Sequence, residues 1–534
     1  MADTILLNAH IPTLDPTLPD GYATAIALRN GKILGLGSDE KILKSRRPHT
    51  EVVDLGGRLL LPGLIDAHCH FSMWSLSRRE IHAEQPTKAL VLDAVRQRAE
   101  STPPGTWITG HGWLQDHWDG IFPTAADLDA VAPHHPVYLR AKSGHAAWVN
   151  SAALTLAHLS ATTPDPDGGK IVRLPDGAPS GILLETAMDL VGHLRPDPTP
   201  AEWDDIIKSG IAEAHRLGLT GVHCFDGATA FQSYQRLHQR GDLTLRITKT
   251  IPVHLLDHAL ALGVRSGFGD DLLRLGNVKV FMDGALGPRT AAMLAPYEGE
   301  PDNFGIVVTD KETLYEVASK ASASGLAMTV HAIGDRANHD TLDVFAALRR
   351  EEAARGETPT QRRHRLEHVQ LLHPDDLTRP AALNVIASMQ PLHATSDMPT
   401  AERYWGDRHP YSYTFKTQLD SGAPLAFGSD APIEVINPFT GIHAAVTSRR
   451  PDGTPGPLGW HPAQRLTVAE AVRAYTTGPA YAGYMEACQG QLAPGYLADL
   501  IVLDRDIFTI DPMDIVNTQV VATLVNGIFR HRTI

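Results

Sequence analysis

Short apolar runs that end in polar or charged residues recur along this chain, and they constrain its fold more than any other feature. Most are separated by stretches of helical character, and such alternation is typical of parallel α/β units. Eight such units close a (β/α)8 barrel, so the sequence predicts an α/β barrel of the TIM type with its site at the C-terminal strand ends. The runs are residues 59–71, 221–226, 245–254, 278–287, 326–335, 364–370, 384–393 and 424–432.

Both ends of the chain carry short alternating runs that are typical of β-strands. They lie in residues 1–58 and 490–534, and each half contains an Asn-Gly pair, a strong signal for a hairpin. Because either half alone is too thin to bury both faces of a sheet, we expect the two ends to pair into one β-sandwich domain. This domain would flank a barrel of residues 59–489. Two unrelated terminal hairpins are the alternative.

The stretch 72–200 is far too long for a simple connection between a barrel strand and its helix. Long insertions on the C-terminal side of a barrel usually shape access to the site, so we expect this one to lie over the active site. Within it, residues 181–194 have helical character. Five of the eight tryptophans form either a core of the insertion or an aromatic pocket wall: Trp74, Trp107, Trp113, Trp118 and Trp148.

Composition excludes several classes of function. The net charge of −14 argues against nucleic acid or an anionic membrane as a partner, and no apolar run is long enough to cross a membrane. Three cysteines at long spacings cannot form a disulfide framework, and the first residues show no secretory signal, so we expect a cytoplasmic protein. Twenty-seven histidines favour metal chemistry.

The first apolar run ends in two histidines with the spacing of a metal site. Successive side chains of a strand alternate between faces, so His68 and His70 point the same way while Cys69 points the other way. Two imidazoles on one face of a strand end can bind one metal ion. Two histidines that merely close a strand are the alternative for an isolated pair, but further acids and histidines end the later runs.

Those later runs supply the other potential ligands. His331 and His368 end the fifth and sixth runs and Asp430 ends the eighth, and such nitrogen and oxygen donors suit zinc and similar divalent ions. Lys279 lies in the fourth run, and a protonated lysine has no lone pair for a metal. It either pairs with an acid such as Asp283 or, once carbamylated by carbon dioxide, bridges two ions through its new carboxylate.

Several motifs follow one another in a recognisable order. They are PGLIDAHCH (62–70), VKVFMDGALGPRTA (278–291), VHAIGDRAN (330–338), RLEHVQ (365–370), SMQPLH (388–393) and FGSDAPIEVINPF (427–439), with GHAAWVNSAAL (144–154) and GILLE (181–185) in the insertion. This order resembles the metal-dependent amidohydrolase superfamily, and within it amidohydrolase family 3, the branch of N-substituted formamide deformylase-like enzymes. The resemblance implies a barrel flanked by a β-sandwich and a metal centre that hydrolyses amide-type C–N bonds.

The resemblance also implies the ligand set. Two divalent ions per chain, zinc by default, would be bridged by carbamylated Lys279, although manganese, iron or nickel fit the same donors. Some amidohydrolases replace the lysine with an acid or use one ion, and Glu185 is the competing candidate here. The implied ligands of the more buried ion are His68, His70 and Asp430, and those of the second ion are His331 and His368.

The implied reaction is hydrolysis of a small N-acyl or N-formyl compound, a class that includes aromatic amides. The metal lowers the pKa of a bound water, and Asp430 acts as general base that takes its proton and passes it to the leaving amine. Side chains that would bind the substrate or its oxyanion are His145, Asn150, Arg289, His393, Trp113 and Glu185. A salt bridge is the alternative role for Arg289, and loop hydrogen bonding is the alternative for Asn150.

Three other functions stay open at this point. A deaminase-like enzyme would use a single metal, typically without the lysine of the fourth run, and a lactonase or ester hydrolase would use the same metal chemistry on another electrophile. A non-catalytic relative would keep the barrel and lose its ligands. The resemblance also implies a homodimer.

Overall fold

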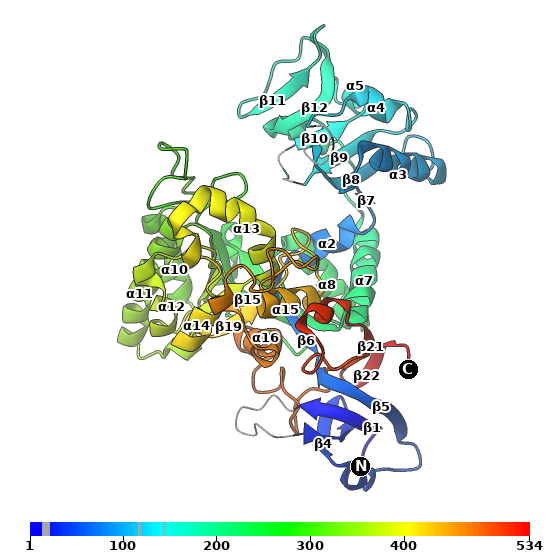
Figure 1. Cartoon of the computed structure of the whole chain (residues 1–534), viewed down its shortest axis with the longest axis vertical. Coiled ribbons are helices and arrows are strands. Elements are labelled where there is room, and N and C mark those ends of the chain that lie inside the picture. The colour runs from blue at the N-terminus through cyan, green and yellow to red at the C-terminus, as the bar shows by residue number, and fades with distance from the viewer. Residues whose placement is uncertain (13–21, 116–117, 119, 143, 145) are drawn as a thin grey trace. The chain divides into compact units, whose positions relative to one another are not determined.

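A computed structural model describes residues 1–12, 22–115, 118, 120–142, 144 and 146–534 (Figure 1). The chain divides into two compact units, one formed by Met1–Phe71 with Lys208–Ile534 and the other by Ser72–Ile207. Within the described residues, no helix has the length and apolar character needed to cross a membrane.

The first unit contains the eight-stranded parallel barrel that the apolar runs predict. Neighbouring strands pair in chain order around the sheet, from β6 through β13 to β19. The strands are β6 (Leu64–Cys69), β13 (Leu219–Cys224), β14 (Arg246–Pro252), β15 (Leu273–Phe281), β16 (Met328–Ala332), β17 (Arg365–His368), β18 (Ile386–Met389) and β19 (Leu425–Phe427).

The first and last barrel strands meet where both end. The backbone N–H of Asp430 donates to the carbonyl of His68 at 2.7 Å, and the N–H of His70 donates to the carbonyl of Ala431 at 2.8 Å. Gly428 permits this approach, because a Cβ at its position would lie 2.4 Å from the backbone nitrogen of His68. The barrel is therefore nearly closed, and its closure brings the ends of β6 and β19 together.

Helices follow the barrel strands, as the alternating pattern predicts. Several begin with a side-chain cap: the Asp310 carboxylate accepts from the Thr313 N–H at the start of α10, and Thr467 and Glu470 form a capping box at α16. The helices are α7 (Pro200–Arg216), α8 (Ala228–Arg240), α9 (Leu256–Ala261), α10 (Lys311–Ala323), α11 (Asp335–Ala354), α12 (Arg379–Ala382), α13 (Pro391–Trp405), α14 (Phe415–Ser421), α15 (Pro438–Thr447), α16 (Val468–Ala474) and α17 (Thr477–Ala482).

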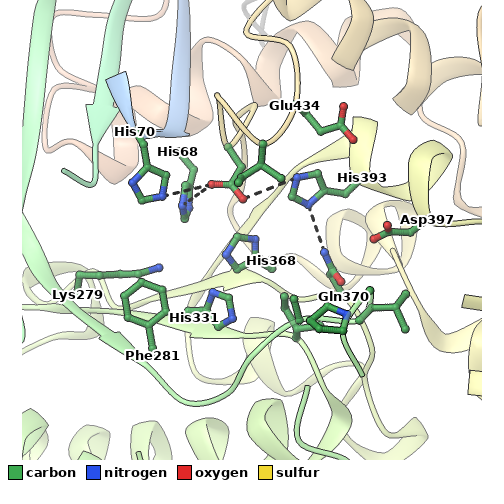
Figure 2. A pocket seen from close by; sticks show the side chains of 17 residues that line it. His68, His70, Lys279, Phe281, His331, His368, Gln370, His393, Asp397 and Glu434 are labelled. Atoms are coloured by element: carbon green, nitrogen blue, oxygen red, sulfur yellow. Dashed lines mark hydrogen bonds and ion pairs between the residues drawn. The ribbon is translucent and has the colours of Figure 1, made fainter. Parts of the chain in front are cut away.

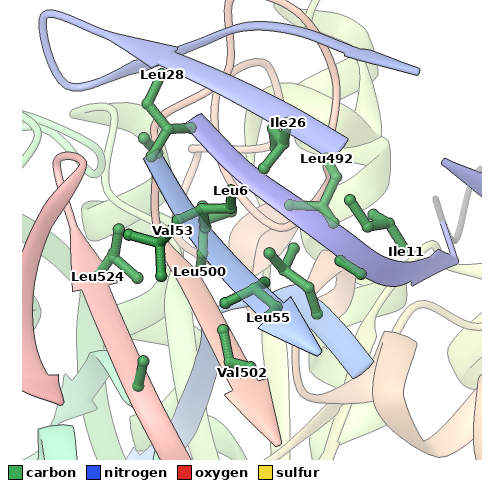
Figure 3. Close-up of a cluster of buried hydrophobic side chains, with 14 of the residues drawn as sticks. Leu6, Ile11, Ile26, Leu28, Val53, Leu55, Leu492, Leu500, Val502 and Leu524 are labelled. Carbon is green, nitrogen blue, oxygen red and sulfur yellow. The ribbon is translucent and has the colours of Figure 1, made fainter. Parts of the chain in front are cut away.

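Strands from the two ends of the chain join one sheet. The long β5 (Glu51–Pro62) connects them, since it pairs with β1 (Thr4–Pro12) through its first part and with β20 (Leu500–Leu503) through its last residues. Leucines and valines from both ends form one core there (Figure 3). The other elements are β2 (Tyr22–Ala23), β3 (Ala25–Arg29), β4 (Lys32–Gly37), β21 (Val520–Val525), β22 (Ile528–Arg532) and α1 (Asp39–Leu43). A two-layered sandwich stays a prediction.

The second unit has its own six-stranded sheet and its own cores. Trp113 and Trp148 are fully buried in one of these cores, with Trp118 packed against it, so these tryptophans form the unit's interior. The elements are α2 (Phe71–Ser77), which begins at the last residue of the first unit, β7 (Ile81–His82), α3 (Lys88–Ser101), β8 (Ile108–Trp113), α4 (Ala125–Asp129), β9 (Val137–Ala141), β10 (Ala146–Val149), α5 (Ser151–Leu156), β11 (Gly169–Arg173), β12 (Pro179–Glu185) and α6 (Asp189–Gly192).

The helix expected over residues 181–194 is wrong for its first half. Residues up to Glu185 form β12, which pairs with β10 on one side and β11 on the other, and only Asp189–Gly192 is an α-helix. Gly181 has a positive φ of 100°, which a helix does not accept. Pairing with strands on both edges, which the local sequence does not reveal, makes residues 181–185 a strand rather than a helix.

Candidate metal centre

Imidazoles from both ends of the barrel sequence lie close to the carboxylate of Asp430, and Figure 2 shows the rings of His68, His70 and His393 in one pocket. Its Oδ1 lies 3.4 Å from Nε2 of His68 and 3.6 Å from Nε2 of His70, both at the end of β6. Its Oδ2 lies 3.8 Å from Nε2 of His393, in the first turn of α13. The Asp430 side chain thus stands between donors from opposite ends of the barrel sequence.

These groups line a cavity of about 380 Å³ at the C-terminal ends of the barrel strands. Its wall is mixed, with imidazoles and carboxylates beside apolar side chains. The lining residues are His68, His70, Lys279, Phe281, Ala285, Leu286, Gly287, Pro288, His331, Ile333, His368, Gln370, His393, Asp397, Asp430, Ile433 and Glu434.

Buried partners orient the histidine rings. Nδ1 of His68 lies 2.7 Å from the Glu367 carboxylate, and an ionised carboxylate can only accept, so Nδ1 donates and Nε2 keeps its lone pair toward Asp430. Nδ1 of His368 likewise donates to Oε1 of Gln390 at 2.9 Å. The ring of His68 also stacks on Phe225, with centroids 3.8 Å apart. Both histidines therefore present a free Nε2.

Electrostatics keep the imidazoles of His68 and His368 neutral. Burial lowers the pKa of His68 and of His368 well below the usual value, and the charge of Lys279 lowers both further. Burial alone would raise the pKa of Glu367, but the charges of Arg365 and Lys279 hold it below its usual value. Neutral imidazole beside ionised carboxylate is the protonation state that a divalent ion requires.

Unusual backbone conformations aim two of the site's side chains. His368 has a φ of 72° and Asp430 a φ of 59°, in the left-handed region that non-glycine residues rarely adopt. Arg365 and Glu367, two apart on β17, form a buried ion pair, whereas the side chain of His368, at the end of the strand, lines the pocket. Such strain concentrates at functional sites.

Two groups of donor atoms in the described chain have the spacing of a metal site. One comprises His68, His70 and Asp430, and the other comprises His368, His393 and Asp430; within each group the ligand atoms lie within 4.8 Å of one another. The free Nε2 atoms of His68 and His368 and the shared carboxylate suit zinc or a similar divalent ion. The residues present therefore fit a metal centre.

Lys279 lies on the opposite side of the pocket from Asp397 (Figure 2). It is buried, and its Nζ stands 4.9 Å from the ring centre of Phe225 and 4.5 Å from that of Phe281. Within the described residues it forms no ion pair, and Asp283 instead accepts backbone N–H groups of Ile333 and Gly334. Burial lowers the pKa of Lys279 to about 8.

His331 also lines the pocket but uses one nitrogen elsewhere. Its Nε2 lies 2.9 Å from the carbonyl of Gly284, so Nε2 donates and Nδ1 is the nitrogen left for a ligand. Its ring centre lies 4.5 Å from that of His368. Burial lowers the pKa of His331 to about 3, which keeps the ring neutral.

The residues expected to bind the substrate do not all line the pocket. His393 lines the pocket. Arg289 does not, and its guanidinium pairs with Glu300 at 2.6 Å and lies over the Tyr404 ring, which is the salt-bridge alternative. His145 lies outside the described residues.

Three of those residues belong to the unit Ser72–Ile207. The side chain of Asn150 is fully buried and caps α5, and its amide donates to the carbonyls of Ala132 and His135. Trp113 is fully buried, and its indole N–H donates to the carbonyl of Leu139. Glu185 is exposed at the end of β12. The contacts of Asn150 and Trp113 are those of structural residues within their own unit.

Several pocket and supporting residues did not emerge from the sequence. Glu367 and Gln390 hold metal-site histidines, and Gln370, Asp397 and Glu434 line the cavity. Glu367 directly precedes His368 in RLEHVQ, and Gln390 directly follows β18. The sequence signal that could have identified Glu367 and Gln390 is the position of a polar residue at a strand end, close to a candidate ligand.

Comparisons with known proteins agree with this geometry. The amidohydrolase family profile matches residues 51–530. The putative amidohydrolase YtcJ of Bacillus subtilis (strain 168) is 34% identical over 522 residues, which cover 96% of each chain. N-substituted formamide deformylase of Arthrobacter pascens is 30% identical over 552 residues, 99% of this chain and 98% of the relative. The crystal structure of an uncharacterised metal-dependent hydrolase from Pyrococcus horikoshii OT3 has a TM-score of 0.78 at 28% identity and covers 95% of this chain and 99% of that one.

A parallel eight-stranded barrel with a histidine-rich pocket at its C-terminal end defines the class of metal-dependent hydrolases. The chain belongs to the amidohydrolase family, and the resemblance drawn from its motifs is confirmed.

Proposed function

We propose that the protein hydrolyses an amide-type C–N bond of a small N-acyl or N-formyl compound. The observation that carries this proposal is the convergence of His68, His70 and His393 on Asp430 inside one cavity. Divalent ions, zinc by default and two per chain, would be held by the six residues that the motifs imply: His68, His70, Lys279, His331, His368 and Asp430. When bound, such ions polarise a carbonyl and lower the pKa of water.

The chain's own groups then supply the proton transfers. Asp430 accepts a proton from the attacking water and returns it to the nitrogen of the departing amine. His393 is set to donate: Gln370 Nε2 lies 3.2 Å from its Nδ1, so Nδ1 accepts and the proton of the ring sits on Nε2, on the side of Asp430. An N–H donor at this place would stabilise the negative charge that develops on the carbonyl oxygen.

Carbamylation of Lys279 is part of the proposal. The reaction with carbon dioxide needs a neutral amine, and the pKa of about 8 that burial gives Lys279 leaves about a tenth of the amine neutral at pH 7. The absence of an ion pair on Lys279 within the described residues leaves the amine available. A lysine here also disfavours the single-metal deaminase scheme. The homodimer and the cytoplasmic location stay predictions.

A hydrolysis panel tests this function. The full-length protein, stripped with a chelator and reloaded with Zn²⁺ or Mn²⁺, is offered N-formyl, N-acyl and cyclic amides together with lactones and amidines. We expect release of amine from amides by the reloaded protein and background release by the stripped protein. Turnover of lactones or amidines alone would contradict the proposal and favour the ester-hydrolase or deaminase alternative.

A further inference from the structure

Two acids of the pocket take no part in the chemistry proposed above. Asp397 of α13 and Glu434, in the loop after β19, both line the cavity. Figure 2 shows both carboxylates on the side of the pocket away from Lys279. Neither acid belongs to the donor groups that meet at Asp430. They are therefore acids of the pocket that the metal centre leaves unused.

Neither carboxylate forms an ion pair in the described part of the chain. Asp397 accepts a hydrogen bond from the hydroxyl of Tyr413, and Glu434 forms no ion pair or hydrogen bond there. Burial raises the pKa of Asp397, an effect that nearby His393 and the hydrogen bond from Tyr413 only partly offset. A carboxylate partly withdrawn from water and without a cation is costly, so a cavity that keeps two of them suits a partner from outside the chain.

Asp397 and Glu434 both raise the pKa of one side chain, the buried Tyr413. The pKa of the Tyr413 hydroxyl is raised well above its usual value by burial, then by the charge and hydrogen bond of Asp397, and further by the charge of Glu434. Two carboxylates around one neutral hydroxyl create a concentrated negative potential.

A separate observation concerns Gln370, which is 4% exposed and lines the same cavity. Its Nε2 donates to His393, and its Oε1 is buried without a donor among the described residues. A buried acceptor without a partner costs free energy unless a ligand donates to it. This wall therefore offers acceptors from three residues: Gln370, Asp397 and Glu434.

We propose that this wall binds a cationic, N–H-rich group of the substrate, an ammonium or a guanidinium, at the end remote from the scissile amide. The inference rests on the proposed function only in calling the ligand a substrate. A cation with several N–H donors satisfies all three acceptors at once and neutralises the paired acids. Asp397, Glu434 and Gln370 then determine specificity for charged over neutral amides.

The kinetic test compares two formamides of equal length. Mono-N-formyl-1,5-diaminopentane ends in an ammonium, and N-formylhexylamine ends in a methyl group at the same position. For the metal-loaded full-length protein, we expect kcat/KM to favour the cationic substrate about 10- to 100-fold, as charged hydrogen bonds allow.

Substitutions then assign that preference to the wall. Asp397→Asn and Glu434→Gln should each lower the preference about tenfold, and the double variant should remove it. Glu434 lies half-buried in a loop, so its variant keeps the test decisive should Asp397→Asn fail to fold. Asp375→Asn, which removes an acid whose side chain is 89% exposed, is the matched control and should retain the preference.

A binding experiment separates this inference from the proposed function. Calorimetric titration of the same protein with pentylguanidinium and with its neutral analogue pentylurea needs no turnover. Preference for the guanidinium, lost in Glu434→Gln, supports the wall even if the hydrolysis panel fails. Equal affinity for both probes, within about twofold, overturns the inference even if neutral amides are hydrolysed.

Discussion

Asp430→Asn is expected to lower kcat/KM for an amide substrate about a thousandfold at saturating metal, because the amide side chain cannot accept the proton of the attacking water. Asparagine preserves the shape of the side chain, and the backbone bond from residue 430 to the carbonyl of His68 does not depend on the carboxylate. The measurement is steady-state hydrolysis of the best amide from the panel, with metal content determined on the same samples.

A matched substitution tests whether the loss of any one negative charge would lower the activity. Asp375→Asn removes an exposed carboxylate that lines no part of the cavity, and it should leave kcat/KM unchanged within about twofold. If Asp430→Asn, loaded with as much metal as the parent, kept activity within tenfold of it, Asp430 would not be the base.

Arg365→Ala is expected to destabilise the barrel by about 3–5 kcal/mol, because it leaves the Glu367 carboxylate buried without its cation. Arg365 is 2% exposed, and its guanidinium lies 2.8 Å from Glu367, with further bonds to Ser388 at 2.9 Å and to the carbonyl of Ala67 at 2.7 Å. Urea unfolding followed by intrinsic fluorescence measures the loss in free energy of unfolding.

The control for this prediction is an exposed pair. Arg505 pairs with Asp504 at 2.8 Å with its side chain 32% exposed, and solvent screens that interaction. Arg505→Ala should therefore cost less than about 1 kcal/mol. Equal losses for the two variants would show that Glu367 does not depend on Arg365 for its burial.

The barrel was predictable because its signal is local. Each strand is a short apolar run bounded by turn residues, and each run ends with its polar residues toward one rim of the sheet. The structure confirms all eight runs as parallel strands in chain order. Residues 181–185 of β12 were misjudged because they are held by partners on both edges, and one of these, β10, pairs with them across 34 to 38 positions of sequence.

The candidate ligands were predictable from strand ends, but their supporting contacts were not. His68, His331, His368 and Asp430 each end an apolar run, and the structure brings all four to one cavity. Glu367 contacts His68 across 299 positions of sequence, a distance that no local pattern spans.

Residues that the sequence suggested from loops and from the insertion do not line the cavity in the cases of Trp113, Asn150 and Arg289. The buried contacts of Trp113 and Asn150 lie in the interior of their own unit, which a tryptophan-rich stretch of sequence does not distinguish from a pocket wall. Arg289 forms an ion pair with Glu300, which lies eleven positions away in the sequence. Orientation in such segments is set by tertiary contacts.

Zinc titration of the chelator-stripped protein tests most directly whether the converging imidazoles hold a metal ion. The account predicts tight binding by the parent and affinity weaker by about a hundredfold or more in His68→Ala, since even the partners that orient metal ligands contribute 10- to 100-fold. His49→Ala, at an exposed histidine, should bind as the parent does. Equal zinc affinity in the parent and in His68→Ala would contradict the metal centre and the hydrolase mechanism built on it.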